Sequence, residues 1–491
     1  MGLDKKDMKH AILLLWHKDI EQLKNLIKLF DEDFKFYIHI DKKSIITKEE
    51  IGRLKNNQQI AEVYQKYRIN WGGFNILKAE LLLLQEIVRD NSIGYIHFMS
   101  GQDYPIKKLD GIKSFFSKNN GKEFIEYIKL PVKKWEHGTY DRFVYYRLND
   151  WFDYNTHKGY RIIEKFIAIQ KRIGYKRRIP DQFEHLYGGS NWMSITYECA
   201  KHITENKRKY RRFYNRLKYT FAADEVYFHT VILNSIFANK VEKNNQRCIL
   251  WDGKGSPIIL NETHWWEIIT SNRLFARKLD NKVSAKLIEY INRYLFADNE
   301  VITNSQGCWL NENLNGHCYD NKLATGLLRL FSLMEVYSIA DFGCGPGWYV
   351  ALLRKQGYEV EGYDGNPNVE KMSSLLFSDG FHCQYMDFTE ESEAEEPFDV
   401  VMSLEVGEHI PVQWEDTFIK NLTRNARKYI ILSWAAEGQY GDGHINNRPN
   451  SYIIELLCRQ GFILNRPASV YLREQASLWW FKNTIMVFDR I

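Results

Sequence analysis

A glycine-rich run at residues 341–347 has the composition of a nucleotide-binding turn. It reads Asp-Phe-Gly-Cys-Gly-Pro-Gly, and it lies between an apolar stretch and a predicted helix at 349–355. Such a turn brings backbone N–H groups and a helix N-terminus close to a ligand. We therefore predict the first strand, turn and helix of a Rossmann-like unit. The predicted cofactor contacts in this run are Asp341, Gly343, Gly345 and Gly347.

Acidic residues at the ends of the next predicted strands fit the same cofactor site. Asp364 ends the second strand, where a carboxylate can accept hydrogen bonds from both ribose hydroxyls. Asp387 ends the third, where a carboxylate can bind an adenine amino group. A fourth strand at 398–403 precedes a segment that contains Glu405 and His409. An NAD-binding domain is the main alternative, but it usually has a different glycine spacing.

This series resembles the class I S-adenosylmethionine-dependent methyltransferases over residues 316–491. The resemblance implies S-adenosylmethionine as the methyl donor. Methyl transfer is an in-line displacement, so the protein mainly aligns donor and nucleophile. A sugar hydroxyl would also lose a proton, and His409 and His444 are the candidate catalytic bases. Each histidine fits a loop-ordering hydrogen-bond donor equally well, and Glu405 and Glu408 either contact the methionine part of the donor or cap the next helix.

Length, composition and charge indicate a soluble protein of several domains. The 491 residues are 44% hydrophobic and 26% charged, and they are too many for one ordinary core. A net charge of +5 is too small to indicate nucleic acid as a partner. The seven cysteines form no CxxC pair, so a reducing cytoplasm is expected. The apolar run at 11–16 is too short for a signal peptide or a membrane span.

The first 130 residues alternate apolar, β-rich runs with segments of helical period. We expect strands at 11–16, 36–41 and 95–100, and helices at 20–30 and 75–90. This alternation predicts a largely parallel sheet with helices on both faces. Because ligands lie beyond the carboxyl ends of such strands, Asp41 and Asp103 fall along one rim, with Asp103 as a candidate acceptor contact.

Seven separated segments of this half carry a second resemblance. They lie at residues 10–14, 37–44, 71–73, 100–107, 188–192, 223–230 and 274–278. In this order they resemble glycosyltransferase family 14, the core-2/I-branching β-1,6-N-acetylglucosaminyltransferases and peptide xylosyltransferases, over residues 9–295. The resemblance implies a GT-A-like fold, a UDP-sugar donor and inversion at the anomeric carbon. The predicted fold class is therefore α/β, with an N-terminal GT-A-like domain and a C-terminal Rossmann-like class I methyltransferase domain.

The resemblance also assigns roles to individual residues of this half. Glu225 matches the family's catalytic glutamate, the general base on the acceptor hydroxyl, although its type and place alone would suit a solvated acid in a first helical turn. Lys278 matches the diphosphate-binding lysine, with Arg277 beside it, and Asp41 lies where the strand end meets the uridine. Trp251 is a candidate acceptor platform or, alternatively, a core residue.

Three regions are predicted: a glycosyltransferase domain at 1–297, a junction at 298–320 and a methyltransferase domain at 321–491. The two resemblances imply S-adenosylmethionine as the cofactor of the methyltransferase domain and a UDP-sugar as the donor substrate of the glycosyltransferase domain. The animal members of the resembled family do without the Asp-x-Asp metal motif of other GT-A enzymes. We interpret the acidic run at 31–33 as a solvated loop and expect no metal.

Together these features predict a bifunctional glycan-modifying enzyme of surface polysaccharide biosynthesis. It would transfer N-acetylglucosamine or xylose from a UDP-sugar to a glycan acceptor, free or lipid-linked, and methylate a sugar hydroxyl. In the alternatives, the C-terminal domain holds S-adenosylmethionine or a glycan without turnover, or methylates a protein or small molecule. Neither half predicts a nucleic-acid partner.

A basic amphipathic helix is expected at 160–178, with apolar residues at 162, 166, 169 and 173. This pattern fits either an anionic membrane surface or packing against the sheet with a solvated basic rim. The expected location is therefore the cytoplasm, including peripheral contact with the inner face of the cell membrane.

Overall fold

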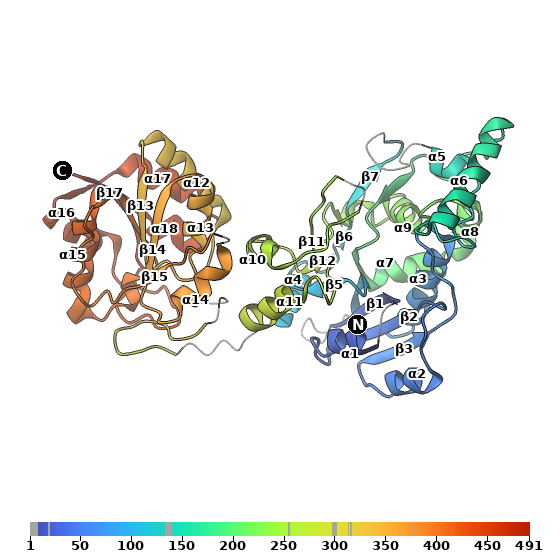
Figure 1. The fold of residues 1–491 in the computed structure, drawn as a ribbon, viewed down its shortest axis with the longest axis horizontal. Coiled ribbons are helices and arrows are strands. Elements are labelled where there is room, and N and C mark those ends of the chain that lie inside the picture. The colour runs from blue at the N-terminus through green and yellow to red at the C-terminus, as the bar shows by residue number, and fades with distance from the viewer. Residues whose placement is uncertain are drawn as a thin grey trace. The chain divides into compact units, whose positions relative to one another are not determined.

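The chain divides into two compact units, which are described separately (Figure 1). One comprises Met1–Asn261 and Ser271–Ala285, and the other comprises Glu262–Thr270 and Lys286–Ile491. The computed structural model describes residues 8–17, 20–132, 140–253, 256–296, 302–312, 314, 317–377 and 379–491. Residues 298–301, 313, 315 and 316 of the predicted junction lie outside the described residues, and the predicted domain boundaries stay predictions.

The first unit is built on a seven-stranded sheet with a parallel centre. Its strands in spatial order are β10 (Val241–Glu242), β6 (Glu123–Phe124), β9 (Ser194–Thr196), β4 (Ile93–Ser100), β1 (Lys9–Trp16), β2 (Phe34–Ile40) and β3 (Ile60–Tyr64). Strands β4, β1, β2 and β3 run parallel, and β9 is antiparallel to β4 and β6. The carboxyl ends of four neighbouring strands therefore meet at one edge of the sheet.

Strand β1 is apolar from residue 11 to residue 16 because helices cover both faces of the sheet. Ala11 and Leu13 belong to a core shared with α3 (Phe74–Ile87), α7 (Tyr197–Glu205) and α9 (Asp224–Leu233). Ile12 and Leu14 point to the opposite core, which α1 (Ile20–Ile27) and α4 (Leu109–Lys118) complete. A strand buried on both faces reads as a continuous apolar run, which explains why the sequence pattern predicted it.

Smaller elements surround this sheet. A three-stranded sheet contains β11 (Arg247–Ile249), β12 (Phe275–Arg277) and β5 (Asp103–Pro105), and β7 (Tyr127–Lys129) pairs with β8 (Tyr187–Gly189). The remaining helices of the unit are α2 (Lys48–Lys55), α5 (Asp141–Val144), α6 (His157–Arg172) and α8 (Lys207–Leu217). Helix α11 (Ala285–Tyr290) begins at the last residue of the unit.

The second unit has a doubly wound sheet. Its spatial order is β15 (Gln384–Tyr385), β14 (Glu359–Asp364), β13 (Ser338–Phe342), β16 (Phe398–Leu404), β17 (Ala426–Ser433), β19 (Met486–Arg490) and β18 (Phe462–Leu464). The first five strands are parallel and follow the 3-2-1-4-5 order of a Rossmann sheet, whereas β19 is antiparallel to both neighbours. The strand order changes direction at β13, which is where such sheets bind ligands.

Helices cover both faces of this sheet as well. Ile339 packs with α12 (Asn321–Leu333), α13 (Trp348–Lys355) and α17 (Arg466–Gln475). Ala340 and Phe342 point to the other face, where α15 (Glu415–Asn425) and α16 (Asn450–Arg459) pack. The unit also contains α10 (Trp265–Ile269), α14 (Val369–Ser373) and α18 (Trp479–Thr484).

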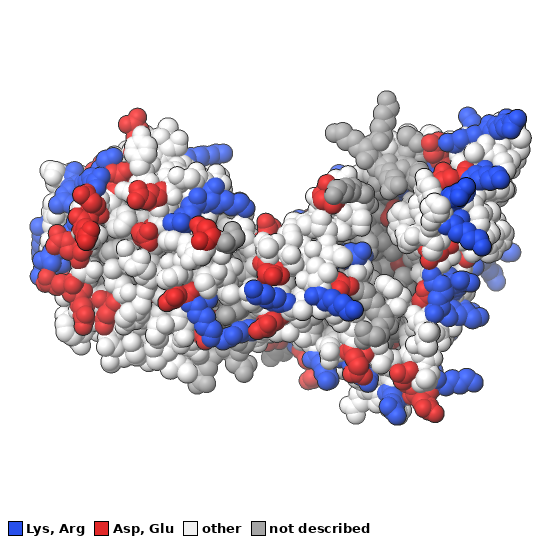
Figure 2. Space-filling model, viewed as in Figure 1, with Lys and Arg blue, Asp and Glu red and all other residues white. Residues whose placement is uncertain are grey.

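Helix α6 presents a different face to the core from the one that the sequence pattern predicted. Ile163 and Ile167 are buried, whereas Ile169 and Ile173 are 48% and 69% exposed. Exposed Lys and Arg side chains lie along the same helix (Figure 2). Among the described residues, no helix is both long and apolar enough to cross a membrane.

His39, near the end of β2, makes folding stability depend on pH. The residue is fully buried, and its Nε2 accepts the backbone N–H groups of Lys66 and Tyr67 at 3.3 and 3.0 Å. Burial lowers the pKa of His39 to about 4, although Asp41 acts in the opposite direction. The unfolded chain, with the ordinary histidine pKa of 6.5, therefore takes up this proton first as the pH falls.

We predict that the wild-type chain loses about 2 kcal/mol more stability than a His39→Gln variant between pH 7 and pH 5. The glutamine can accept the same hydrogen bonds but does not titrate. Urea unfolding of both proteins at the two pH values measures the difference. Equal losses for the two proteins would show that His39 does not carry this pH dependence.

Candidate active sites

The glycine-rich turn joins β13 to α13 and is tied to the end of β14. Gly343, Gly345 and Gly347 have φ angles of +82°, +54° and +87°, a left-handed region that glycine enters without the cost of a Cβ atom. The N–H of Gly343 donates to the carbonyl oxygen of Tyr363 at 2.8 Å. The N–H of Gly345 donates to the carboxylate of Asp364 at 2.7 Å. Asp364 thus orders the glycine-rich turn. The sequence had predicted that this carboxylate and the turn contact the same cofactor.

A cavity of about 430 Å³ opens at these strand ends. The predicted site residues that line it are Asp341, Gly343, Gly345, Asp364, Glu405, His409 and His444. Gly347 and Asp387 have local structural roles instead. A Cβ on Gly347 would lie 2.7 Å from the sulfur of Cys383, and Asp387 accepts the backbone N–H and hydroxyl of Thr389 at 2.9 and 2.6 Å. Their contacts with a cofactor stay predictions.

Two neighbouring carboxyl groups at the base of the cavity share an unusual electrostatic environment. Burial, with a further contribution from Asp364, raises the pKa of Asp341 to about 8. Burial also raises the pKa of Asp364, although two backbone N–H groups oppose the shift. Near neutral pH, Asp341 is therefore largely protonated, and a protonated carboxyl group can donate a hydrogen bond to a ligand.

Glu405 follows β16 directly and holds a strained backbone conformation. Its φ of +57° is uncommon for a residue with a side chain, and such residues concentrate at functional sites. Its backbone N–H donates to the hydroxyl of Ser433 at 2.9 Å, and its carboxylate accepts hydrogen bonds from Gln439 and Thr484. Burial raises the pKa of Glu405. These contacts fix the direction of a carboxylate that lines the cavity.

His409 and His444 have the same tautomer. Nδ1 of His409 lies 3.1 Å from the carbonyl oxygen of Gly443, and Nδ1 of His444 lies 3.1 Å from that of Gln439. A carbonyl oxygen can only accept, so each Nδ1 carries the proton and each Nε2 has a free lone pair. Burial, and then His444, lowers the pKa of His409 to about 4. Each ring therefore orders a loop and presents an unprotonated Nε2, although the lowered pKa makes His409 a weak proton acceptor.

Residues of the predicted junction also line this cavity, although none of them was predicted as a site residue. Cys308, Trp309 and His317 are among them. The rings of Trp309 and His317 are 5.0 Å apart, and a Cβ on Gly345 would lie 2.6 Å from Nδ1 of His317. The imidazole therefore lies directly on the glycine turn. The sequence signal that could have indicated these site residues was a tryptophan and a histidine within an otherwise polar, Asn-rich segment.

In the first unit, the structure brings three of the resembling segments together. Asp103 accepts the N–H of Ser100 at 2.6 Å and its hydroxyl at 2.8 Å, and it pairs with Arg277 at 3.0 Å. The guanidinium of Arg277 lies 3.6 Å from the ring centroid of Trp192. Burial lowers the pKa of Arg277, and Asp103 opposes this. The predicted acceptor contact and the predicted nucleotide contact therefore bind each other, and their ligand contacts stay predictions.

Glu225 lies in the first turn of α9 beside two buried acids. Its side chain is 28% exposed, and its carboxylate is 3.5 Å from a guanidinium nitrogen of Arg142. Burial raises the pKa of Asp224 to about 6 and that of Glu80 well above its usual range. Asn191 donates to Glu80 at 2.5 Å. Of these three acids, only Glu225 is placed to meet a substrate from solution.

The other predicted residues of this half lie on separate segments. Asp41 is buried, and its carboxylate accepts the backbone N–H groups of Lys43 and Ile69 at 2.9 and 3.0 Å, so it orders the chain after β2. Lys278 follows β12 directly and is half-buried. Trp251 is 59% exposed, which excludes the core alternative for this residue.

Both α/β units carry candidate site residues at the carboxyl ends of parallel strands. This arrangement is typical of an enzyme with two catalytic domains. Residues 11–274 match the family model of the core-2/I-branching enzymes, which spans more than half of the sequence, and the chain belongs to this family. Residues 312–430 match a methyltransferase domain. Both resemblances and the predicted α/β fold class are therefore confirmed, and the chain combines a glycosyltransferase domain with a methyltransferase domain.

Two human xylosyltransferases are similar to the first domain. Human xylosyltransferase 2 is 25% identical over 327 residues, which cover 60% of this chain and 34% of that protein. Human xylosyltransferase 1 is 23% identical over 319 residues, which cover 58% and 30%. The chain thus spans about one third of the length of these relatives.

Solved structures are also similar in part. The magnesium protoporphyrin IX methyltransferase of Synechocystis PCC 6803 with bound SAM is 19% identical, with coverage of 43% and 98% and a TM-score of 0.28. The amino pentose methyltransferase CalS10 of Micromonospora echinaspora is 12% identical, with coverage of 36% and 93% and the same TM-score. TM-scores this low do not support an assignment. The assignment of the second unit as a methyltransferase domain therefore depends on the family match of residues 312–430.

Proposed function

We propose that the chain is a bifunctional glycan-modifying enzyme of surface polysaccharide biosynthesis. Its first domain transfers a sugar from a UDP-sugar to a glycan acceptor with inversion, and its second methylates a sugar hydroxyl with S-adenosylmethionine. The names of the similar xylosyltransferases favour xylose over N-acetylglucosamine as the donor sugar. The observation that carries the proposal is that one chain holds both domains.

In the first domain, sugar transfer depends on Glu225, the partly exposed acid in the first turn of α9. The acceptor hydroxyl attacks the anomeric carbon, the bond from that carbon to the diphosphate oxygen breaks, and Glu225 takes the hydroxyl proton. Arg142 is close enough to orient this carboxylate. Lys278 and Arg277 would offset the negative charge that develops on the leaving diphosphate.

Methyl transfer is assigned to the cavity at the glycine turn. The acceptor oxygen attacks the methyl carbon in line, and the carbon–sulfur bond breaks with its electron pair left on sulfur. The ordered glycine turn and the carboxyl groups of Asp341 and Asp364 supply polar contacts for the donor. His409 and His444 are the candidate proton acceptors, since each has a free Nε2 lone pair.

We predict that Glu225→Gln lowers sugar transfer by about a thousandfold and changes UDP-sugar affinity little, because the amide keeps the shape but cannot take the proton. Turnover of radiolabelled UDP-xylose and calorimetry with UDP measure the two effects. Glu198→Gln is the matched control, since Glu198 is an exposed acid in the first turn of α7. Near-normal turnover of the Glu225 variant would remove this residue as the base.

The proposal includes peripheral contact of the first domain with an anionic membrane. Helix α6 exposes Ile169 close to the basic side chains of Lys171 and Arg172, and Ile173 follows them. The apolar side chains would enter the lipid interface, and the basic side chains would contact the anionic headgroups. This contact would place the domain near a lipid-linked acceptor.

A double charge reversal, Lys171→Glu with Arg172→Glu, should weaken binding to vesicles rich in anionic lipid by at least about tenfold. Lys322→Glu with Lys355→Glu is the control, because it makes the same change of charge at exposed residues of the second unit. Vesicle co-sedimentation measures both. Equal binding by wild type and the α6 variant would contradict the membrane contact.

A further inference from the structure

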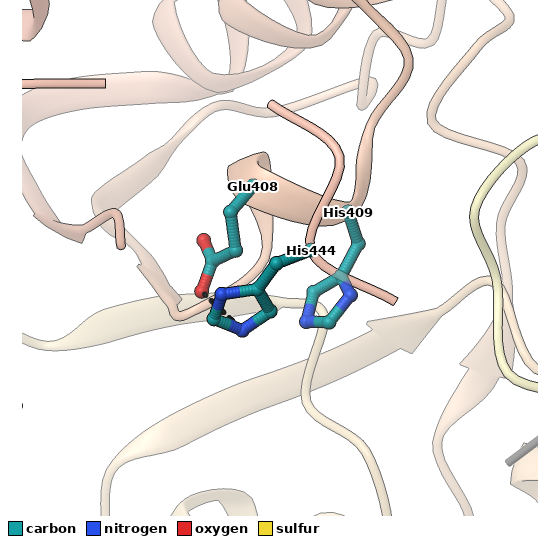
Figure 3. Close-up of side chains that lie close together, drawn as sticks. All are labelled: Glu408, His409 and His444. Atoms are coloured by element: carbon teal, nitrogen blue, oxygen red, sulfur yellow. Dashed lines mark ion pairs between the residues drawn. The ribbon is translucent and has the colours of Figure 1, made fainter. Parts of the chain in front are cut away.

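Glu408, His409 and His444 are side chains of types that can ligate a metal, and they lie close together beside the cavity of the second unit (Figure 3). One ligand atom from each lies within 4.8 Å of the others. Glu408 and His409 belong to the turn after β16, whereas His444 comes from the segment between β17 and α16. Two separate loops therefore converge, and both histidines line the cavity.

The hydrogen bonds of the two histidines leave the correct atoms for a metal. Each Nδ1–H donates to a backbone carbonyl, of Gly443 for His409 and of Gln439 for His444. Metal-bound histidines typically donate their second ring N–H to such an acceptor, which fixes the tautomer and the ring orientation. Both Nε2 atoms are then unprotonated. The rings lie 5.0 Å apart and nearly perpendicular.

Glu408 supplies an independent observation. Its side chain is fully buried, and within the described part of the chain neither carboxylate oxygen forms a hydrogen bond of good geometry. One oxygen lies 3.9 Å from Nε2 of His444. The carboxyl group of Glu405 is also within hydrogen-bonding reach of Glu408. The cost of burying a carboxylate can be offset by protonation or by coordination to a metal ion, and the two imidazole nitrogens close to Glu408 favour coordination.

We propose that this cluster binds one divalent transition-metal ion through Nε2 of His409, Nε2 of His444 and the carboxylate of Glu408. Imidazole ligands favour transition-metal ions over Mg²⁺ and Ca²⁺, which prefer oxygen ligands, and Mn²⁺ is the transition-metal ion of this group that also accepts carboxylate readily. Metal–ligand distances of about 2.1 Å place neighbouring ligand atoms roughly 3 to 3.5 Å apart, so small side-chain rotations complete the site. This site departs from the sequence-based expectation of no metal.

The ion has a role that depends on the proposed methyl transfer. Three protein ligands leave positions open toward the cavity, where two neighbouring hydroxyl oxygens of a sugar can bind. Coordination lowers the pKa of the acceptor hydroxyl, its proton passes to water, and its oxygen attacks the methyl carbon while the carbon–sulfur electron pair stays on sulfur. In this arrangement the histidines hold the ion and do not act as bases.

The test uses the full-length chain freed of metal with a chelator and then titrated with Mn²⁺ alone, with free Mn²⁺ followed by electron paramagnetic resonance. The variants are His444→Gln and Glu408→Gln. The matched controls are His382→Gln and Glu370→Gln, because these two residues form a surface pair at 3.5 Å with the same chemical groups. Calorimetry with S-adenosylmethionine is run on every protein, and circular dichroism reports whether each is folded.

We expect one Mn²⁺ per chain in wild type and in both controls, with affinity at least about tenfold lower in the two cluster variants. If Glu408→Gln does not fold, the His444→Gln variant alone tests the site. The His444 side chain is 13% exposed and that of Glu408 is fully buried, so the histidine substitution disturbs the core less. No Mn²⁺ binding by wild type, or unchanged affinity in folded His444→Gln, overturns the site. Mn²⁺ binding without S-adenosylmethionine binding supports the site and contradicts the proposed methyl transfer.

Discussion

Helices cover both faces of each seven-stranded sheet, so a ligand can reach the parallel strands only where the strands end. In the second unit this constraint places Asp364 at the end of β14 and Glu405 after β16, on either side of the glycine turn. The hydrogen bond from Gly345 to Asp364 then joins two strand ends into one surface. In the first unit the same constraint places Asp41 after β2 and Asp103 after β4.

The second constraint is the cost of burying charge at these strand ends. Asp103 is compensated by Arg277, and Asp364 accepts two backbone N–H groups. Asp341 avoids the cost by holding its proton, since its pKa is about 8. Burial also raises the pKa of Glu408 well above its usual range, so this carboxyl group can hold a proton as Asp341 does. The proposed cation would take the place of that proton and make the carboxylate a ligand, so the case for a metal depends on the two imidazole nitrogens beside it.

The sequence predicted the parts of the fold that depend on local pattern. The apolar runs at 11–16 and 36–41 became β1 and β2, and the glycine turn and Asp364 lie where the pattern placed them. The pairing of Glu225 with Arg142 was not predictable, because residues far apart in the chain carry no signal of mutual contact. His317 was missed for the same reason, since it reaches the glycine turn from a polar segment.

The buried face of α6 shows how small an error changes an interpretation. Successive residues of a helix differ by about 100° in direction, so a shift of one position from the predicted set to Ile163 and Ile167 moves the packed face. That shift leaves Ile169 and Ile173 exposed, which the sequence pattern had placed on the apolar face. Which face a helix buries depends on its partners, and a single segment does not contain that information.

Mass spectrometry of a glycan acceptor panel tests the central claim, that one chain adds a sugar and a methyl group. The full-length chain is incubated with UDP-xylose or UDP-N-acetylglucosamine, with and without S-adenosylmethionine. We predict that an acceptor gains one pentose or one hexosamine with the UDP-sugar, and one additional methyl group only when S-adenosylmethionine is present. A product that gains the sugar but never a methyl group, from a chain that binds S-adenosylmethionine, would contradict the bifunctional account.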